Sequence, residues 1–595
     1  MMNWPRFAVF FAALFASLLV PGAAVSSFAT TPDSAPGAFD GPAELPRVHV
    51  KSALADTPAP GKVRTVKSSE DFRDALKDAA CGDTLKLEAG AVFAGHFTIP
   101  AKHCDDAHWI IIRTSTPDSA LPAEGTRLTP CYAGVASLPG RPEYPCPTPK
   151  NVLARIEFQK RGRGPIEFAT GANHYRFLGL EITRTASEDP VSGLILLEEH
   201  AIADHIVFDR DWIHGTAQSE TTRGIGFGAS TDVAVVDSYF TDFHCIAAVG
   251  TCTDAQAILG GLGSNPMGPY KIENNFLEAS GEVIMFGGGG ATSAPHDIEI
   301  RRNHLFRPLL WMKDNPGFVG STSGRPFIVK NIFELKNALR LLFEDNVLEN
   351  CWGGFSQEGY AILLTPKNQD PNRCPECVTL DVTIRNSWIK NVAAGFQIAN
   401  ARSDAGAFAK DGGRYSIHNV LVENLDGDRF HGHGVMFEIL SAQIVLHDIS
   451  IDHVTGMASR ALFLLGARTS EAKMANFTLT NNLLGVGRLQ QIILTGMGTE
   501  NCAYQPEVQG PAGVFASCFT NSKVAGNVIV GGSNKWPARN SLVKHVSDVG
   551  FKAADKNVIS DYGLHANSKY KGAGIDQKDI GADVEALEAA TKDIL

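Results

Sequence analysis

The chain has 595 residues, a formal net charge of −11 and no cluster rich in lysine or arginine. This length exceeds what one compact hydrophobic core usually supports, so the chain requires several domains or an architecture that grows in one dimension. The charge balance argues against nucleic acid as a partner. An acidic polysaccharide is not excluded, because an acidic protein can carry a local basic cleft.

Residues 1–28 are predicted to be a signal peptide, with Arg6 before an apolar run over residues 8–20 and small residues at 22–24. A membrane anchor is the alternative, but the apolar run is short for a span. We therefore expect a secreted or periplasmic protein without a membrane span after cleavage. Residues 29–62 are rich in Ala, Pro and Ser, lack periodicity and are predicted to be a disordered linker.

Residues 69–80 are predicted to form a short amphipathic helix. Ser69 is a plausible N-cap, and Phe72, Leu76 and Ala79 share one face. Gly82, Asp83 and Thr84 then open the first strand. A stack of strands with an open end exposes unpaired edges and an apolar core, so we interpret this helix as an N-terminal cap.

From about residue 156 onward, short alternating strands are interrupted by a polar corner. In residues 340–350, the pair Asp345-Asn346 predicts a sharp bend, because Asn tolerates the left-handed conformation. Such corners recur roughly every 28 to 46 residues, a period typical of solenoids, propellers and arrays. The corner residues are Asp209, Asp237, Asn274, Asn303, Asn346, Asn386, Asn419, Asp448, Asn481 and Asn527.

A further strand recurs between the corners, for example over residues 281–286, 331–336, 359–364, 395–398 and 434–439. Three short strands and one corner Asn describe one coil of a parallel β-helix, whose apolar face is buried only by stacking on the next coil. A propeller is the alternative. It needs antiparallel blades with tight hairpins, and Asn-Gly or Asp-Gly hairpins are scarce here.

These repeats resemble the right-handed parallel β-helix of the pectate-lyase-like superfamily. The resemblance implies an all-β solenoid of about 11–13 coils over residues 63–565, with inward ladders of like residues and a corner ladder of Asn. The helix at 69–80 with its following Gly-Asp-Thr resembles the N-terminal cap of β-helix polysaccharide lyases. The superfamily also contains tailspikes, adhesins and proteins without known activity, so the fold does not determine the function.

Residues 566–595 are predicted to be a C-terminal capping tail that ends in a helix from Val584 onward. Asp583 is interpreted as the N-cap of that helix. The alternative is a calcium site of Asp576, Asp579 and Asp583, whose spacing differs from that of an EF-hand. No metal ligand is assigned, and calcium is left open as a cofactor.

Eleven cysteines and an exported chain predict disulfides. Neighbours in sequence suggest the pairs Cys81–Cys104, Cys131–Cys146, Cys245–Cys252 and Cys502–Cys518. Cys351, Cys374 and Cys377 form a further group. Either two of them form a disulfide and one is left over, or all three bind zinc together with a fourth ligand. The disulfide is preferred.

Alternation along the strands predicts an outward polar row, because the same position recurs about 4.8 Å away on the next coil. The row consists of Glu282, Glu334, Lys336, Gln397 and Glu438. The charges of residues 330–340 are the densest in any coil. The alternative is a solvated strand face with cross-strand ion pairs.

The leading hypothesis is a lyase that cleaves an acidic polysaccharide by β-elimination, which needs a base and a cation that stabilises the enolate-like charge. Lys336 is assigned as base or charge stabiliser, and Arg340 as the group that binds the substrate carboxylate. Glu282 and Glu334 shape the site. Trp311 and Trp352 lie in or beside long insertions, where exposed rings would stack on sugars.

Gln397, Glu438 and His304 complete the predicted substrate-binding set. Two alternatives stay open. A glycoside hydrolase would use paired carboxylates, such as Glu282 with Glu334 or Glu334 with Glu438. His431-Gly-His433-Gly434 resembles the Gly-His-Gly of polygalacturonases, but the Asn-Thr-Asp, paired-Asp and Arg-Ile-Lys motifs of that family are absent. The other alternative is a non-catalytic carbohydrate-binding or surface-structural solenoid. A monomer is expected, because both ends are covered.

Overall fold

A computed structural model describes residues 37–197, 203–246, 252, 254–263, 266–354, 357–400, 402–403, 405–442, 444–494, 497–553 and 558–595. The predicted signal peptide and residues 29–36 lie outside the described residues. The chain divides into two compact units, Met1–Gly37 and Ala38–Leu595. Everything below concerns the second unit.

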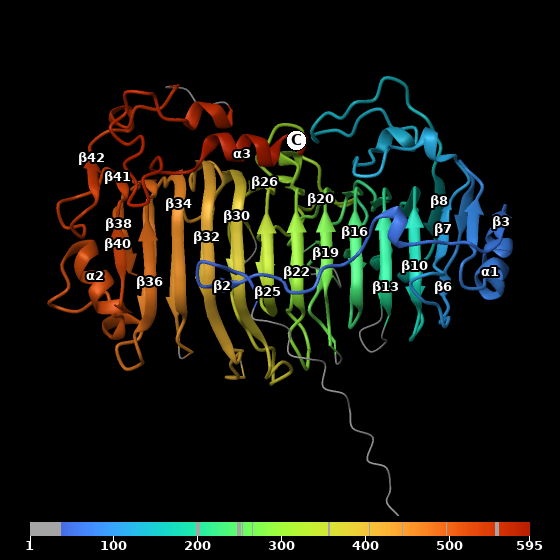
Figure 1. Ribbon diagram of the computed structural model, residues 1–595, viewed down its shortest axis with the longest axis horizontal. Coiled ribbons are helices and arrows are strands. Elements are labelled where there is room, and N and C mark those ends of the chain that lie inside the picture. Colours follow the sequence, from blue (N-terminus) through green and yellow to red (C-terminus); the bar gives the residue numbers. More distant parts are fainter. Residues whose placement is uncertain are drawn as a thin grey trace, which may run out of the picture. The chain divides into compact units, whose positions relative to one another are not determined.

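The second unit is a parallel β-helix, as the repeats predicted. Successive coils contribute strands to three rows, and the strands of each row stack in chain order along one axis (Figure 1). The first row is a sheet of 12 parallel strands, in agreement with the predicted number of coils. The second and third rows are joined into one larger sheet, because in three coils a single long strand runs through both.

The first row consists of β6 (Phe97–Ile99), β9 (Gly162–Phe168), β12 (Val191–Leu197), β15 (Arg223–Gly226), β18 (Gln256–Gly260), β21 (Ile284–Phe286), β24 (Phe333–Leu335), β29 (Tyr360–Leu364), β31 (Ala394–Ala399), β33 (Val435–Ser441), β35 (Ala461–Ala467) and β38 (Gln490–Leu494). The second row consists of β3 (Val63–Val66), β4 (Thr84–Leu87), β7 (Ile110–Thr114), β10 (Asn173–Leu178), β13 (Asp204–Asp209), β16 (Thr231–Val236), β19 (Tyr270–Glu273), β22 (His296–Arg301), β25 (Ala338–Glu344), β36 (Met474–Thr480), β39 (Phe519–Thr520) and β40 (Lys523–Ala525). The third row consists of β5 (Val92–Ala94), β8 (Ala154–Phe158), β11 (Leu180–Arg184), β14 (Trp212–His214), β17 (Tyr239–Thr241), β20 (Phe276–Glu278), β23 (His304–Phe306), β26 (Val347–Cys351), β37 (Leu483–Gly485), β41 (Val528–Val530) and β42 (Ser541–Val543). The strands that run through both are β30 (Val378–Val392), β32 (Asp411–Leu425) and β34 (His447–Met457).

Alternation explains why these short strands stack. In β24, Phe333 and Leu335 enter the core while Glu334 between them faces outward. Parallel registers place Ile284 and Phe286 of β21 next to them on one side, and Ile362 and Leu364 of β29 on the other. One apolar cluster therefore runs from Val66 to Trp536 through the inside of the coils.

Side-chain amides tie the coils together at the corner between the second and third rows. The Asn303 Oδ1 atom accepts hydrogen bonds from the backbone N–H and the Nδ2 of Asn275, each at 3.0 Å. Asn346 repeats this contact one coil later, at 2.9 Å from the N–H of Asn303. The residues just before them, Arg302 and Asp345, have φ of 54° and 57°. The predicted bend at Asp345-Asn346 and the predicted corner ladder of Asn are confirmed, but Asp448, which was predicted as one of these corners, lies at the start of the long strand β34 (His447–Met457) instead.

A further set of residues with left-handed backbone conformation stacks from coil to coil near the start of the second-row strands. We call this set the left-handed ladder. Its members share φ between 51° and 58° and occupy equivalent places in the register. They are His174, His205, Asp232, Asp297, Arg340, Asp381, Arg414, Asp448 and Asn476. Several neighbours bind each other, since Arg340 contacts both oxygens of Asp297 and Arg414 contacts both oxygens of Asp381.

Helices α1 (Ser69–Asp78) and α2 (Gly510–Cys518) lie at opposite ends of the stack (Figure 1). Both contribute to the main core, α1 through Phe72 and Leu76 and α2 through Val514 and Phe515. The N-cap of α1 is Ser68, whose side chain accepts from the Asp71 N–H, instead of the predicted Ser69. Helix α2 was not predicted, because its sequence lies in what the alternation marks as a loop insertion.

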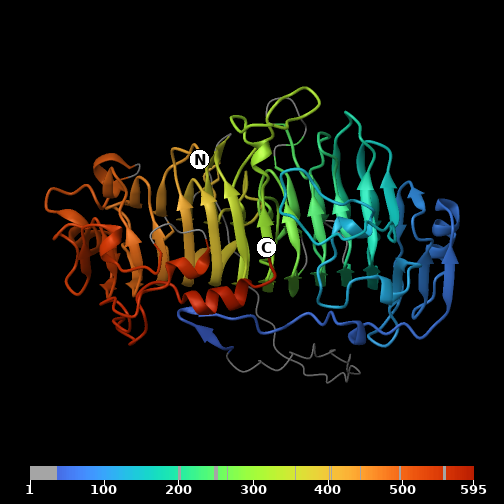
Figure 2. The ribbon, with the colours of Figure 1, turned by 90° about the horizontal axis from the view of Figure 1, so that it is seen from above.

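Helix α3 (Val584–Thr591) begins after Asp583, which caps it as predicted. The helix does not cover the last coil, however. It lies along the side of the stack, where Leu587 packs with Val347, Trp388 and Leu421 (Figure 2). The tail thus covers outward apolar residues of the third row, while α2 packs into the main core at the end of the stack. The Asp576 carboxylate contacts His453, and Asp579 contacts Lys571, so the alternative calcium set does not assemble.

The residues from 38 to 60, here called the N-terminal strap, correct the predicted disordered linker. They contain a small hairpin of β1 (Phe39–Asp40) and β2 (Ala43–Glu44) and run across the second row (Figure 1). The Glu44 N–H donates to Asp381, and the Arg47 N–H donates to Asp297. A composition without periodicity means that the strap has no core of its own, and it gains order by binding the left-handed ladder.

All four predicted disulfides between sequence neighbours are present. In the third group, Cys374 and Cys377 form the disulfide, and Cys351 is a free thiol buried in the core. The zinc alternative is therefore wrong. A second small hairpin, β27 (Gly353–Gly354) with β28 (Gln357–Glu358), follows Cys351.

Candidate functional site

The outward face of the first row carries a continuous line of side chains. Strand register places Glu334 beside Leu363, and Gln397 beside Glu438. The Gln397 Nε2 donates to Glu438 Oε2 at 3.0 Å. The residues in this line, in coil order, are Leu259, Met285, Glu334, Leu363, Gln397, Glu438 and Leu464. Three of the five predicted polar residues thus share one line, and an apolar Leu separates Glu334 from the other two.

Four charged side chains gather beside Glu334, and together with it they form what we call the lysine–carboxylate cluster: Asp254, Glu282, Lys330, Glu334 and Lys336. The Lys336 Nζ lies 2.8 Å from Glu334 Oε1. The Lys330 Nζ contacts Asp254 and lies 3.6 Å from Glu282 Oε1. Three coils therefore contribute to one cluster, which the stacking of β18, β21 and β24 brings together.

Neutral amides complete the contacts of the two glutamates. Gln256 Nε2 donates to Glu282 Oε2 at 2.8 Å, and Asn331 Nδ2 donates to Glu334 Oε2 at 3.0 Å. Glu282 is fully buried, whereas the side chains of Lys330 and Lys336 are 12% and 20% exposed. The two ammonium groups are thus the part of the cluster that an approaching ligand meets before the glutamates.

Burial and neighbouring charges give the two glutamates of this cluster different pKa values. Burial, and next to it the neighbouring Glu334, raises the pKa of Glu282 to about 7. Burial also opposes ionisation of Glu334, but Lys336 and Lys330 outweigh it and hold the pKa of Glu334 below its ordinary value. Glu282 is therefore the group of the cluster that gains or loses its proton near neutral pH.

The same carboxylates act on the lysines. Burial lowers the pKa of Lys336, but Glu334 and Glu282 outweigh this effect and raise it above its ordinary value. Lys330 is raised in the same way by Glu282 and Asp254. Both lysines are ammonium groups at neutral pH. Of the two roles predicted for Lys336, charge stabiliser agrees with this protonation state and base does not.

The cluster does not have the arrangement of a calcium site. Calcium takes six to eight oxygen ligands, which must be free to turn toward it. Here Gln256, Asn331 and the two ammonium groups contact the glutamate oxygens. The lysines supply the positive charge that a divalent cation would otherwise bring.

Arg340 lies apart from this cluster. It follows Lys336 by four residues, but the chain turns from the first row into the second at Asn337, so Arg340 belongs to β25. Its Nε and NH2 atoms donate to the two oxygens of Asp297 at 2.7 and 3.0 Å. Proximity in sequence placed Arg340 beside Lys336, and the corner between the rows separates them.

The expectation that Trp311 and Trp352 are exposed is wrong. They are 2% and 5% exposed and pack with Phe327, Val329 and Phe430. The guanidinium groups of Arg141 and Arg307 lie over the two rings at 5.5 and 5.4 Å. The insertion that carries Trp311, including η4 (Leu309–Trp311), folds onto the β-helix and buries its own aromatic residues.

Both tryptophans nevertheless line a cavity of about 280 Å³. Its wall also contains His431, Asp314 and Val329, the residue before Lys330. One face of each tryptophan is covered by a guanidinium group, which leaves less ring surface for a sugar than the prediction assumed.

His304 lies on β23 in the third row, away from the first-row face. Its Nε2 is 3.1 Å from Glu349 Oε2, and burial lowers its pKa. It lines a different cavity of about 410 Å³ together with Arg127, Tyr144 and Arg302.

The sequence prediction did not include a tyrosine–histidine pair on the first-row face. The Tyr360 hydroxyl and His433 Nδ1 are 3.0 Å apart, and His433 Nε2 lies 3.6 Å from Glu358. Burial, and next to it Glu438, raises the pKa of Tyr360 well above its ordinary value. The signal for this pair was the motif Gly432-His433-Gly434, which places a histidine between two residues that allow close backbone approach.

The fold and the first-row face define a parallel β-helix protein with buried, paired charges on an outward sheet surface. No family model matches this chain, and no curated protein matches it. Several solved structures are similar to it. A mannuronic acid specific polysaccharide family 6 lyase from human gut microbiota is 11% identical with a TM-score of 0.45, covering 81% of this chain and 91% of that one.

The catalytic unit of a GH87 alpha-1,3-glucanase from Streptomyces thermodiastaticus is 11% identical with a TM-score of 0.44, covering 85% of this chain and 72% of that one. Pectate lyase Pel9A is 11% identical with a TM-score of 0.31, covering 89% of this chain and 97% of that one. Likenesses this low do not define the chemistry of this chain, whose fold follows from its own strand registers.

Proposed function

We propose that this protein is a lyase that cleaves a uronate-containing polysaccharide by β-elimination at the lysine–carboxylate cluster. The observation that supports the proposal is the position of Glu282, a buried carboxyl group with a pKa of about 7 whose Oε1 atom lies 3.6 Å from the Lys330 ammonium. β-Elimination beside a carboxylate needs this combination, a base matched to neutral pH and cations that stabilise the developing negative charge.

In the proposed step, Lys330 and Lys336 bind the carboxylate of the uronate whose C5–H bond breaks. The Glu282 carboxylate accepts the C5 proton, and its Oε1 atom, which has no hydrogen-bond partner within the described part of the chain, is the accepting atom. The electron pair of the C5–H bond forms the C4–C5 double bond, and the C4–O4 bond breaks. The O4 atom leaves with that bond pair and takes a proton from the Lys336 ammonium, which the solvent restores.

Substrate binding changes the balance of charge in a favourable direction. The substrate carboxylate takes over part of the contact that Lys330 makes with Asp254 and Glu282. A base that loses contact with its cation becomes more basic, since a nearby positive charge holds its pKa down. Binding therefore prepares Glu282 to accept the proton.

The test is to incubate the protein with pectate, alginate and a glycosaminoglycan and to follow the ultraviolet absorbance of the unsaturated uronide. We expect absorbance with one of these substrates. Glu282→Gln and Lys336→Ala should each lower kcat/KM by about 10² to 10⁴, the usual effect of removing a positioned base or charge stabiliser. Lys410→Ala is the matched control, because Lys410 forms an exposed pair with Glu376 at 2.6 Å.

Other outcomes separate the alternatives. New reducing ends without the chromophore would indicate a glycoside hydrolase. Saturable binding of a polysaccharide without any cleavage would indicate a non-catalytic binding protein. Full lyase activity in Lys336→Ala would remove the assignment of this cluster.

We also infer that the protein acts outside the reducing cytosol. Five disulfides link ten of its eleven cysteines, and such pairs persist in secreted and periplasmic proteins. Among the described residues, no helix is long and apolar enough to cross a membrane.

A further inference from the structure

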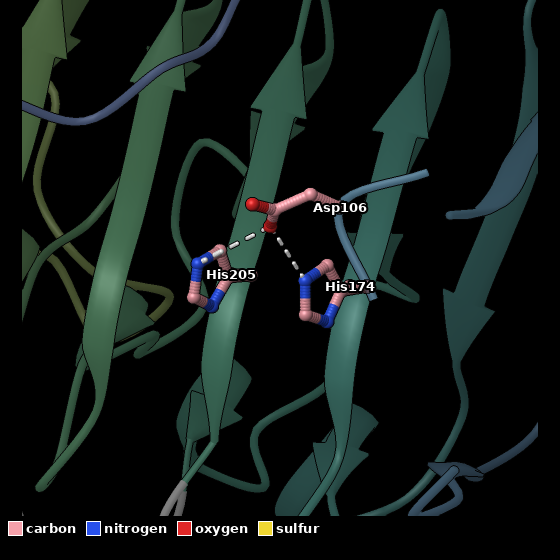
Figure 3. A group of neighbouring side chains, drawn as sticks. All are labelled: Asp106, His174 and His205. Carbon is pink, nitrogen blue, oxygen red and sulfur yellow. Dashed lines mark hydrogen bonds and ion pairs between the residues drawn. The ribbon is translucent and has the colours of Figure 1, made fainter. Parts of the chain in front are cut away.

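Two histidines and an aspartate converge on the outer face of the second row, whereas the lysine–carboxylate cluster lies on the first row. His174 is on β10 and His205 on β13, and Asp106 is on the loop before β7 (Figure 3). Asp106 Oδ1 lies 3.1 Å from His174 Nε2 and 3.8 Å from His205 Nε2. One ligand-type atom of each residue lies within 4.8 Å of the others.

The left-handed ladder explains why the imidazole rings of His174 and His205 stack on each other. His174 and His205 have φ of 57° and 54° and occupy the same position on neighbouring coils. Their rings are therefore stacked, with centroids 4.4 Å apart and an angle of 8° between the planes. The edges that carry both Nε2 atoms face the same carboxylate (Figure 3).

Elsewhere on the ladder, neighbouring coils place opposite charges at this position, as in Asp297 with Arg340 and Asp381 with Arg414. At its N-terminal end the ladder instead places two imidazoles together and follows them with Asp232. The pKa of Asp232 is raised by burial, and His205 is the largest influence that opposes this effect. Asp232 is thus a further carboxylate within electrostatic reach of the pair.

The outer contact of His205 has the pattern of a metal site, and among the described residues His174 offers its Nε2 without such a contact on its other nitrogen. His205 Nδ1 lies 2.7 Å from Asp204 Oδ1, so a carboxylate fixes this ring and leaves Nε2 directed toward Asp106. Metal-bound histidines almost always make such a contact through their second nitrogen. The His174 side chain is 8% exposed, and its Nδ1 has no hydrogen-bond partner within the described part of the chain. Its polar contact is through Nε2.

We propose that Asp106, His174 and His205 form a site for a divalent transition metal ion, with zinc as the best fit. Zinc takes nitrogen and oxygen ligands at about 2.0–2.2 Å, so two ligands of one ion lie about 3 to 4 Å apart. The two Asp106 to histidine distances fall in this range, and the stacked imidazole rings would turn about their side-chain bonds to direct both Nε2 lone pairs at one ion. Imidazole ligands favour zinc over calcium or magnesium, which take oxygen.

The bound ion would tie a surface loop to the coils. Asp106 follows Cys104 by two residues, and the Cys81–Cys104 disulfide fixes the start of this loop. Trp109, three residues later, packs its ring edge-on against His174 at 5.0 Å. A side chain of Asp106 that is 85% exposed leaves room for water in the remaining coordination positions. The site would thus have three protein ligands and an open position, the arrangement of a zinc ion that exchanges ligands.

The test uses the whole exported chain without a histidine tag, stripped with a chelator and titrated with zinc in competition with a chromophoric indicator. We expect one equivalent of zinc. Asp106→Asn and His205→Gln should each weaken binding at least 10-fold, and Asp204→Asn by about 10- to 100-fold through the orientation of His205. Cobalt in place of zinc should give visible absorption bands that the variants lose.

His447→Gln is the matched control. His447 lies next to Asp448 of the same ladder, and both of its ring nitrogens contact carboxylates, those of Asp411 and Asp448. Its substitution should leave zinc binding unchanged. Asp106→Asn changes an exposed loop residue, so its effect does not depend on folding of the core. No zinc uptake by the stripped protein, or equal affinity in Asp106→Asn and His205→Gln, would overturn the proposal.

Discussion

Glu282→Gln is predicted to make the protein more stable at alkaline pH while it removes the proposed lyase activity. Gln resembles the protonated glutamate in shape and keeps an oxygen for Gln256 Nε2. In the folded protein Glu282 has a pKa of about 7 in place of the ordinary 4.5. Its ionisation therefore opposes folding, because the unfolded chain gives up this proton at a lower pH than the folded one.

The magnitude follows from the two pKa values. One pKa unit corresponds to 1.36 kcal/mol, so the cost of ionising Glu282 is about 3 kcal/mol once both states have lost the proton. A raised carboxyl pKa contributes stability that is fully present below 4.5 and is lost as the pH rises to about 7. The variant should match the natural protein at about pH 4 and exceed it by about 3 kcal/mol at about pH 8.

Equilibrium urea unfolding at several pH values, followed by tryptophan fluorescence, measures this difference. Glu376→Gln, which changes the exposed partner of Lys410, should show no comparable pH dependence. A Glu282→Gln variant that is less stable at about pH 8, or whose difference from the natural protein does not change with pH, would refute the argument. Glu282 would then ionise at its ordinary pKa, and the proposed step would lose its base.

Three further predictions concern the scaffold. Asn303→Ala removes a fully buried amide and leaves the Asn275 N–H and the Ile272 carbonyl without partners, so urea unfolding should show a loss of about 3 to 5 kcal/mol. Asn303→Asp, which keeps an acceptor, tests whether the lost contacts or the lost volume matter. Arg340→Ala should cost about 2 kcal/mol, because it leaves the buried Asp297 without its two-oxygen partner. Its kcat/KM should stay unchanged, and a fall in kcat/KM would return Arg340 to the site. Cys351, the one free cysteine of the eleven, should not react with a thiol reagent in the native protein and should react as a single equivalent in denaturant; rapid native labelling would contradict its burial.

The sequence predicts the architecture well, because every coil of the parallel β-helix needs the same alternation of apolar and polar residues and the same kind of corner residue. Alternation assigns Phe333 and Leu335 to the core and Glu334 to the outside, and a corner Asn such as Asn346 must supply both a turn and hydrogen bonds. Disulfides between sequence neighbours follow for a similar reason, since short loops bring their cysteines together.

Features that depend on contacts between distant segments were not predictable in this way. The strap binds Asp297 and Asp381 through backbone N–H groups, which leave no side-chain signal. Helix α3 packs on apolar residues of the third row, such as Trp388, and the sequence around Trp388 does not indicate this contact with a distant segment.

The candidate site shows the same limit. Strand register predicts that Glu334, Gln397 and Glu438 lie in one line. The depth of burial, which register does not give, decides which carboxyl group titrates near neutral pH. Glu282 and Lys336 differ in protonation at neutral pH because of their neighbours, which a single strand does not reveal. The histidine pair had a sequence signal, since Asn173-His174-Tyr175 and Asp204-His205-Ile206 are one coil apart.

The strap also constrains the order in which the chain completes its structure. Its partners come late in the sequence. Arg47 binds Asp297, Glu44 binds Asp381 and Asp40 binds His418, up to 378 residues downstream. Coils can add to one another as the polypeptide emerges, each using only its predecessor. The strap is therefore synthesised before its partners and reaches its final contacts after them, and a truncated product that lacks the later coils has no partner residues for it.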